Sequence, residues 1–98
     1  MAYRVKQTEE FERWLDGITD PIAQKAIVRR IIRVEGGLFG DVKSLGSGLS
    51  EMRIDVGQGY RVYYTVIGNA VVFMLYGGTK STQRRDISKA KEMAGDIE

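Results

Sequence analysis

The sequence predicts a single α+β domain, in which an N-terminal helix hairpin packs on a small antiparallel sheet and a short helix ends the chain. Two patterns predict this class: apolar residues recur at helical spacing through residues 8–35, and alternate with polar residues through residues 49–77. Length is the third observation, because 98 residues are enough for one hydrophobic core and not for two. Residues 1–98 are therefore expected to form one domain.

Composition excludes several classes of protein. Hydrophobic residues make up 43% of the chain and charged residues 29%, as in soluble globular proteins. No apolar stretch is long enough to span a membrane, and the first residues lack the apolar segment of a signal peptide. The chain contains neither cysteine nor histidine, so we expect no disulfide, no metal site and no cofactor. These features predict a cytoplasmic protein.

Capping residues mark the start of both N-terminal helices. After a short strand expected at residues 2–6, Thr8 has the side chain of a helix N-cap and is followed by two glutamates. Asp20 and Pro21 begin the second helix, because an acidic cap followed by proline is a typical helix start. This helix is expected to end at Glu35, since two glycines follow it.

Alternation and glycine-containing turns predict the sheet. If Val56 pairs with Tyr60 and Ile67 pairs with Ala70 across the two hairpins, one face becomes apolar and can be covered by the helices. The opposite face is then open, and a rigid sheet carrying polar groups is a suitable place for chemistry. The strands are expected at residues 42–45, 49–56, 60–67 and 70–77. The open face would carry Glu51, Arg53, Asp55, Arg61, Tyr63, Thr65, Met74 and Tyr76.

The C-terminal part is rich in cations. Residues 77–80 are expected to form a loop, and Ser81 or Thr82 to cap the last helix. Within residues 80–91, lysines and arginines are dense and Asp86 is the only acid. Such a density of one charge favours a polyanionic partner.

Three segments carry a resemblance to a known family. FERWL at residues 11–15, GYRVY at 59–63 and GGTKSTQ at 77–83 resemble segments of the HigB-like addiction module killer proteins, in the RelE/ParE toxin superfamily. The resemblance extends over nearly the whole chain. It implies a RelE-like fold, and the toxin of a type II toxin–antitoxin module that cleaves mRNA on the ribosome. It also implies a cognate antitoxin, often a helix-turn-helix protein, in addition to the ribosome and its mRNA.

The resemblance assigns roles to the basic residues of the sheet. Arg61 matches the family's central arginine and would stabilise charge, with Arg53 and Lys80 as phosphate ligands. Residue type and position add further RNA-binding candidates, with the tyrosines as stacking groups. These are Lys43, Tyr63, Tyr76, Arg84 and Arg85. Attack by a 2′-hydroxyl also needs a proton acceptor. Four residues stay open for that role: Glu51, Asp55, Lys43 and Lys80.

Other interpretations of the same residues stay open. A ParE-like toxin has the same fold but inhibits DNA gyrase by binding, and a module that only binds its antitoxin needs no catalytic group. Arg61 could serve structure alone, as the cross-strand ion-pair partner of Asp55. The second helix also carries a basic stripe, which is more typical of a solvated face than of an RNA contact. Its members are Lys25, Arg29 and Arg33.

Overall fold

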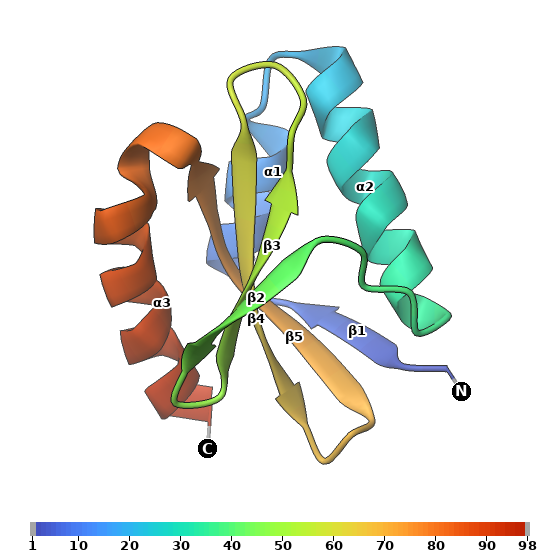
Figure 1. Cartoon of the computed structure of the whole chain (residues 1–98), viewed down its shortest axis with the longest axis vertical. Helices are drawn as coiled ribbons and strands as arrows, with labels where there is room; N and C mark the ends of the chain where they lie inside the picture. The colour runs from blue at the N-terminus through green and yellow to red at the C-terminus, as the bar shows by residue number, and fades with distance from the viewer. Residues whose placement is uncertain (1, 98) are drawn as a thin grey trace.

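The computed structural model describes residues 2–97 and contains a five-stranded mixed sheet and three α-helices (Figure 1). The strands lie in the order β1-β5-β4-β3-β2; β1 runs parallel to β5, and the other neighbours are antiparallel. The α+β class is confirmed, but the expectation of an antiparallel sheet is wrong at β1, whose direction no hairpin turn determines. The elements are β1 (Arg4–Gln7), α1 (Glu9–Asp16), α2 (Pro21–Glu35), β2 (Val42–Gly46), β3 (Leu49–Ile54), β4 (Tyr60–Ile67), β5 (Val71–Thr79), the 3-10 turn η1 (Lys80–Thr82) and α3 (Gln83–Ile97).

The two N-terminal helices begin at the expected caps. The Thr8 hydroxyl accepts a hydrogen bond from the backbone N–H of Phe11 at 3.0 Å. The Asp20 carboxylate accepts one from the N–H of Ile22, also at 3.0 Å. Pro21 occupies the first position of α2, where its missing N–H leaves no hydrogen bond unmade.

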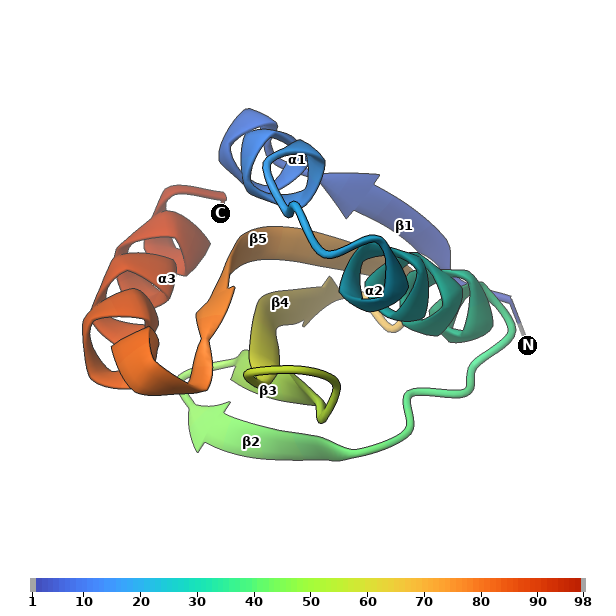
Figure 2. The same ribbon diagram turned by 90° about the horizontal axis from the view of Figure 1, so that it is seen from above.

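Helices cover both faces of the sheet, with α2 and α3 on opposite sides of the strands (Figure 2). The expected open face is therefore wrong: α3 has 15 residues and packs on it with Ala90 and Met93. None of the helices in residues 2–97 is long and apolar enough to cross a membrane. The core between the sheet and helices α1 and α2 consists of Phe11, Ala23, Ile27, Ile31, Val34, Met52, Ile54, Tyr60, Val62, Tyr64, Val72 and Met74. The core between the sheet and α3 consists of Leu49, Tyr63, Leu75, Ala90 and Met93.

The β3–β4 hairpin has a longer loop than expected, because Tyr60 pairs with Ile54, two residues before the expected partner. A shift of two residues leaves every side chain on its expected face, since strand side chains alternate with a period of two. The cross-strand neighbours do change. Arg61 lies opposite Arg53 and not, as expected, opposite Asp55.

The β4–β5 hairpin contains a bulge that the sequence did not reveal. Tyr63 pairs with Tyr76 but Tyr64 pairs with Met74, so Leu75 is an extra residue on β5. The pairing is also shifted before the bulge, because Ile67 pairs with Val71 and not, as expected, with Ala70. A shift of one residue reverses the face of each side chain, so Met74 lies under the N-terminal helices and Leu75 under α3, the reverse of both expectations. The bulge at Leu75 offsets this shift, so Tyr76 stays on its expected face.

Strand β5 continues through Gly77 and Gly78 to Thr79, where a loop was expected. Close packing explains both glycines: a Cβ on the first would overlap the Trp14 ring, and a Cβ on the second would overlap the Asp86 carboxylate. The glycines thus let α1 and the start of α3 approach the sheet backbone.

Candidate functional site

Strands β3 and β4 bring the two arginines of the predicted site together. Arg53 and Arg61 lie directly opposite each other on the face that α3 covers, and Gly78 of β5 is the next residue across the sheet. Residues opposite each other on antiparallel strands have Cβ atoms about 5 Å apart. Two like charges at that separation repel, so the arginine pair needs a counterion.

Glu51 is that counterion. Its Oε2 lies 3.2 Å from Arg53 Nε and 3.8 Å from Arg61 Nε. Its Oε1 accepts a hydrogen bond of 2.5 Å from Gln83 Nε2, at the start of α3. The Glu51 side chain is completely buried, and a buried carboxylate is stable only when it is paired and hydrogen-bonded. Glu51 therefore orients both guanidiniums and links them to α3.

The two arginines differ in their access to solvent. The Arg53 side chain is 34% exposed and lies 3.9 Å from the Asp41 carboxylate. The Arg61 side chain is only 8% exposed, and its Nη1 donates a hydrogen bond to the backbone oxygen of Tyr60. The same Nη1 lies 4.0 Å from exposed Asp55, so the outer end of this guanidinium points toward the hairpin loop. Arg53 is the more accessible of the two to an anion.

Exposed cations lie on the elements that border the arginine pair. Lys43 on β2 is directly opposite Glu51, and the backbone N–H of Lys80 binds the β3–β4 loop. Arg84 and Arg85 are exposed in the first turn of α3. Cations at a helix N-terminus oppose the helix dipole, and a bound anion would offset that repulsion. In residues 2–97, no three carboxylates gather closely enough to hold a metal ion.

Tyr63 is buried, contrary to the expectation that it stacks on a base. Its side chain packs beneath α3 against residues such as Leu75 and Met93. Burial, together with the nearby Glu51 carboxylate, raises the pKa of Tyr63 well above its ordinary value. Its hydroxyl has no hydrogen-bond partner among the described residues. Tyr76, its neighbour on β5, is partly exposed, and its role as a stacking group stays a prediction.

Two polar residues that the sequence reasoning missed hold this site in place. Gln83 joins α3 to Glu51, as described above. Arg30 of α2 donates hydrogen bonds to the backbone oxygens of Arg53, at 2.7 Å, and of Asp41, at 3.3 Å. It therefore fixes the backbone of the accessible arginine. Both side chains lie on helices, where the sequence pattern does not distinguish a polar residue with a structural role from one that only faces solvent.

The fold is that of the RelE toxins. The chain is similar to a mutant of the Escherichia coli toxin RelE in the free state, with a TM-score of 0.68 and 16% identity over 91% of this chain and 98% of that one. It is also similar to the E. coli RelBE toxin–antitoxin complex, with a TM-score of 0.65, 21% identity and coverage of 80% and 96%. An archaeal RelE–RelB complex from Pyrococcus horikoshii gives a TM-score of 0.58, 25% identity and coverage of 82% and 97%.

The chain belongs to the family of phage-derived Gp49-like proteins, which it matches over residues 13–94. It is also 43% identical to an uncharacterized protein of Haemophilus influenzae over 97 residues, which are 99% of this chain and 98% of that protein.

Proposed function

We propose that this chain is the HigB-like toxin of a toxin–antitoxin module and cleaves mRNA on the ribosome, in the cytoplasm. The observation that carries the proposal is the Arg53–Arg61 pair on a rigid sheet of RelE fold, bordered by exposed cations. Two of the similar structures are complexes of a toxin with its antitoxin, which supports a cognate antitoxin as a partner of this chain. A helix-turn-helix antitoxin is the expected kind.

Cleavage would begin with attack of a 2′-hydroxyl oxygen on the adjacent phosphorus. The bond from O2′ to phosphorus forms as the bond from phosphorus to O5′ breaks. O2′ loses its proton and the leaving O5′ takes up one from water, so a 2′,3′-cyclic phosphate and a 5′-hydroxyl remain. Negative charge grows on the phosphate, where fixed cations stabilise it. Partly exposed Arg53 and exposed Lys80 contact the phosphate, and buried Arg61 lies next to Arg53 on the sheet. Glu51, Asp41 and Asp55 offset the charges of the two arginines, so the unpaired positive charge at the site comes from exposed Lys43, Lys80 and Arg84.

The proton of the 2′-hydroxyl has no dedicated acceptor in this site. Glu51 is buried, and its two oxygens accept hydrogen bonds from Arg53 and Gln83. We therefore exclude Glu51 from the four candidate proton acceptors. Asp55, Lys43 and Lys80 remain, and all three are exposed on the borders of the site. We infer that most of the acceleration comes from charge stabilisation and from the ribosome orienting the mRNA.

The test is cleavage of a translated mRNA in a reconstituted system, with and without ribosomes. Cleavage should require ribosomes and fall roughly 10²-fold in Arg53→Ala and in Arg61→Lys. Lysine is used at the second position because truncation would leave Glu51 without a buried partner. Arg33→Ala, which removes an exposed arginine of α2, is the matched control and should cut normally.

Two outcomes would contradict the proposal. If folded Arg53→Ala and Arg61→Lys proteins cut mRNA normally, the catalytic site does not contain this arginine pair. Folded wild-type protein that cuts no mRNA but blocks DNA supercoiling by gyrase would support the ParE-like alternative. If it does neither, the alternative of a module that only binds its antitoxin is favoured.

A further inference from the structure

A cavity with aromatic walls lies beside the β3–β4 loop, where the end of α1 meets the end of β5. Its volume is about 360 Å³. The rings of Trp14 and Tyr60 meet there nearly edge to face, with centroids 6.4 Å apart and an angle of 62° between their planes. Two rings in this arrangement form a corner against which a flat ligand can lie. Apolar and polar side chains share the lining, among them Trp14, Ile18, Thr19, Gln58, Tyr60 and Thr79.

The fold fixes the Trp14 ring before any ligand binds. A Cβ on Gly77 would overlap this ring, so the indole lies directly on the backbone of β5. Phe11 packs against it with ring centroids 5.6 Å apart. Trp14 is nevertheless only partly buried, and it also lines the cavity. A ring held in this way loses little conformational entropy when a ligand stacks on it.

Polar groups stand next to the rings. The Tyr60 hydroxyl accepts a hydrogen bond of 3.4 Å from Gln58 Nε2. A hydroxyl that accepts one hydrogen bond can still donate its own hydrogen, and an amide side chain has both donors and an acceptor. Hydrogen-bonding groups beside an aromatic surface match a nucleobase, which combines a flat ring with a polar edge.

Lys80 connects this cavity with the arginine pair. Its backbone N–H donates a hydrogen bond of 3.1 Å to the oxygen of Gly59, in the β3–β4 loop. It directly follows Thr79, which lines the cavity and pairs with Tyr60. Arg61 is the next residue of β4, and neighbouring strand residues are about 3.3 Å apart along the strand. The exposed Lys80 side chain therefore starts at the border that the cavity shares with the proposed phosphate site.

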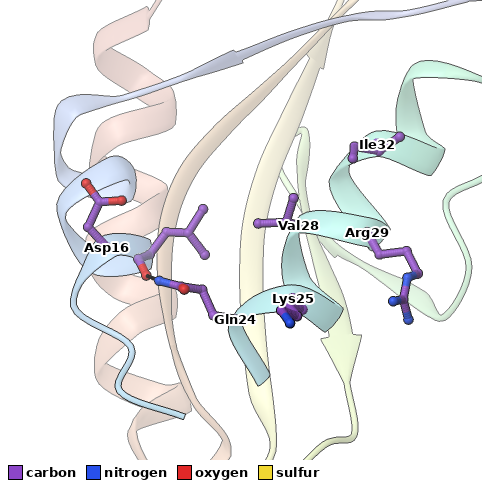
Figure 3. Close-up of a pocket in the computed structure, with 7 residues that line it drawn as sticks. Asp16, Gln24, Lys25, Val28, Arg29 and Ile32 are labelled. Carbon is purple, nitrogen blue, oxygen red and sulfur yellow. Dashed lines mark hydrogen bonds between the residues drawn. The ribbon is translucent and has the colours of Figure 1, made fainter. Parts of the chain in front are cut away.

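A larger groove on the same side of the sheet offers a base less. It has a volume of about 460 Å³ and follows α2 (Figure 3). Its apolar side chains are Leu15, Val28 and Ile32, which are all aliphatic. Bases bind by stacking on aromatic rings, so the cavity at Trp14 suits a base better than this groove does.

We propose that the cavity at Trp14 binds an unpaired base of the mRNA, in a nucleotide beside the cleaved phosphate. The inference rests on the proposed function, since it takes the substrate to be mRNA. Trp14 stacks on the base, and Gln58 and the Tyr60 hydroxyl bond to its edge. Lys80 contacts the phosphate of the same nucleotide. Cleavage then depends on the base at that position.

The test follows the fluorescence of Trp14, the single tryptophan of the chain. The full chain is titrated with a short single-stranded 2′-O-methyl RNA, which lacks the attacking hydroxyl and is not cut. A second RNA has the same backbone but abasic residues. The RNA with bases should quench Trp14 and bind roughly tenfold more tightly than the abasic RNA. Equal affinity for both RNAs would overturn the proposal, because the phosphates alone would then account for binding.

Three variants locate the bound base. Gln58→Ala should weaken binding of the base-bearing RNA roughly fivefold, as expected for one lost hydrogen bond. Ser88→Ala, which removes an exposed hydroxyl from α3, is the matched control and should bind as the wild type does. Ile32→Ala should also bind normally. Unchanged binding in Gln58→Ala, or weaker binding in Ile32→Ala, would overturn the proposal, since the RNA would then lie elsewhere.

Cleavage in the reconstituted ribosome system tests the source of the base. Gln58→Ala should change the relative cutting of different mRNA sequences, because the base that Gln58 contacts varies along the message. Equal slowing at every cut would overturn the proposal, since a base of ribosomal RNA, which does not vary, would then fill the cavity.

The binding assay contains no ribosomes, so its failure differs from failure of the proposed function. Protein that prefers the base-bearing RNA but cuts no mRNA retains the base-binding cavity and loses the nuclease proposal. Protein that cuts mRNA but binds both RNAs equally loses only the cavity.

Discussion

Replacing Glu51 by glutamine should strongly destabilise the protein, because it removes the buried counterion that the two arginines share. The Glu51 side chain has no exposure, and its Oε2 faces Arg53 Nε at 3.2 Å and Arg61 Nε at 3.8 Å. Removing one partner of a buried ion pair typically costs about 3–5 kcal/mol. Arg53 is 34% exposed and regains water, so we expect the lower value, about 3 kcal/mol. For a domain of this size that loss lowers the melting temperature by roughly 12–24 °C.

The assay is urea and thermal unfolding followed by circular dichroism, with Asp55→Asn as the matched control. Asp55 also faces Arg61, at 4.0 Å, but its side chain is 79% exposed, so the control should change the free energy of unfolding by less than about 0.5 kcal/mol. Replacing both Glu51 and Arg61, by leucine and methionine, should restore much of the lost stability, since no buried charge then lacks a partner. A loss below about 1 kcal/mol in Glu51→Gln would refute the reasoning, because Glu51 would not be a desolvated counterion.

Two further substitutions test the packing of the sheet. Tyr63→Phe should leave the free energy of unfolding at pH 7 unchanged or raise it by about 1 kcal/mol, because the lost hydroxyl has no partner. Burial raises the pKa of Tyr63, so the wild type should lose stability as the pH rises above about 10, where the unfolded chain releases this proton first. Urea unfolding at neutral and alkaline pH should show that the free energy of unfolding falls less with pH in Tyr63→Phe than in the wild type. An equal fall in both proteins would show that Tyr63 is not the group that titrates. Gly77→Ala should cost about 2 kcal/mol or more, because its methyl group overlaps the Trp14 ring. Unfolding followed through the single tryptophan measures this cost, and wild-type stability would show that α1 can move away freely.

Features that depend on neighbouring residues could be predicted from the sequence. The caps at Thr8 and Asp20 bond to backbone groups two or three residues away, so the residue types themselves indicate the helix starts. The placement of Arg53 and Arg61 on one face also survived the wrong register, because a shift of two residues preserves the alternation of side chains.

The tertiary structure alone decided what surrounds those arginines. Alternation shows that a strand has two different faces, but it does not show that a distant helix such as α3 covers the polar one. Glu51 and Gln83 are 32 residues apart, and their hydrogen bond exists only because the sheet and α3 fold together. The sequence by itself therefore determined the helices, the strands and the residue types of the site. Burial, counterions and access to solvent depend on contacts between residues far apart in the chain, and only the packed structure determines these.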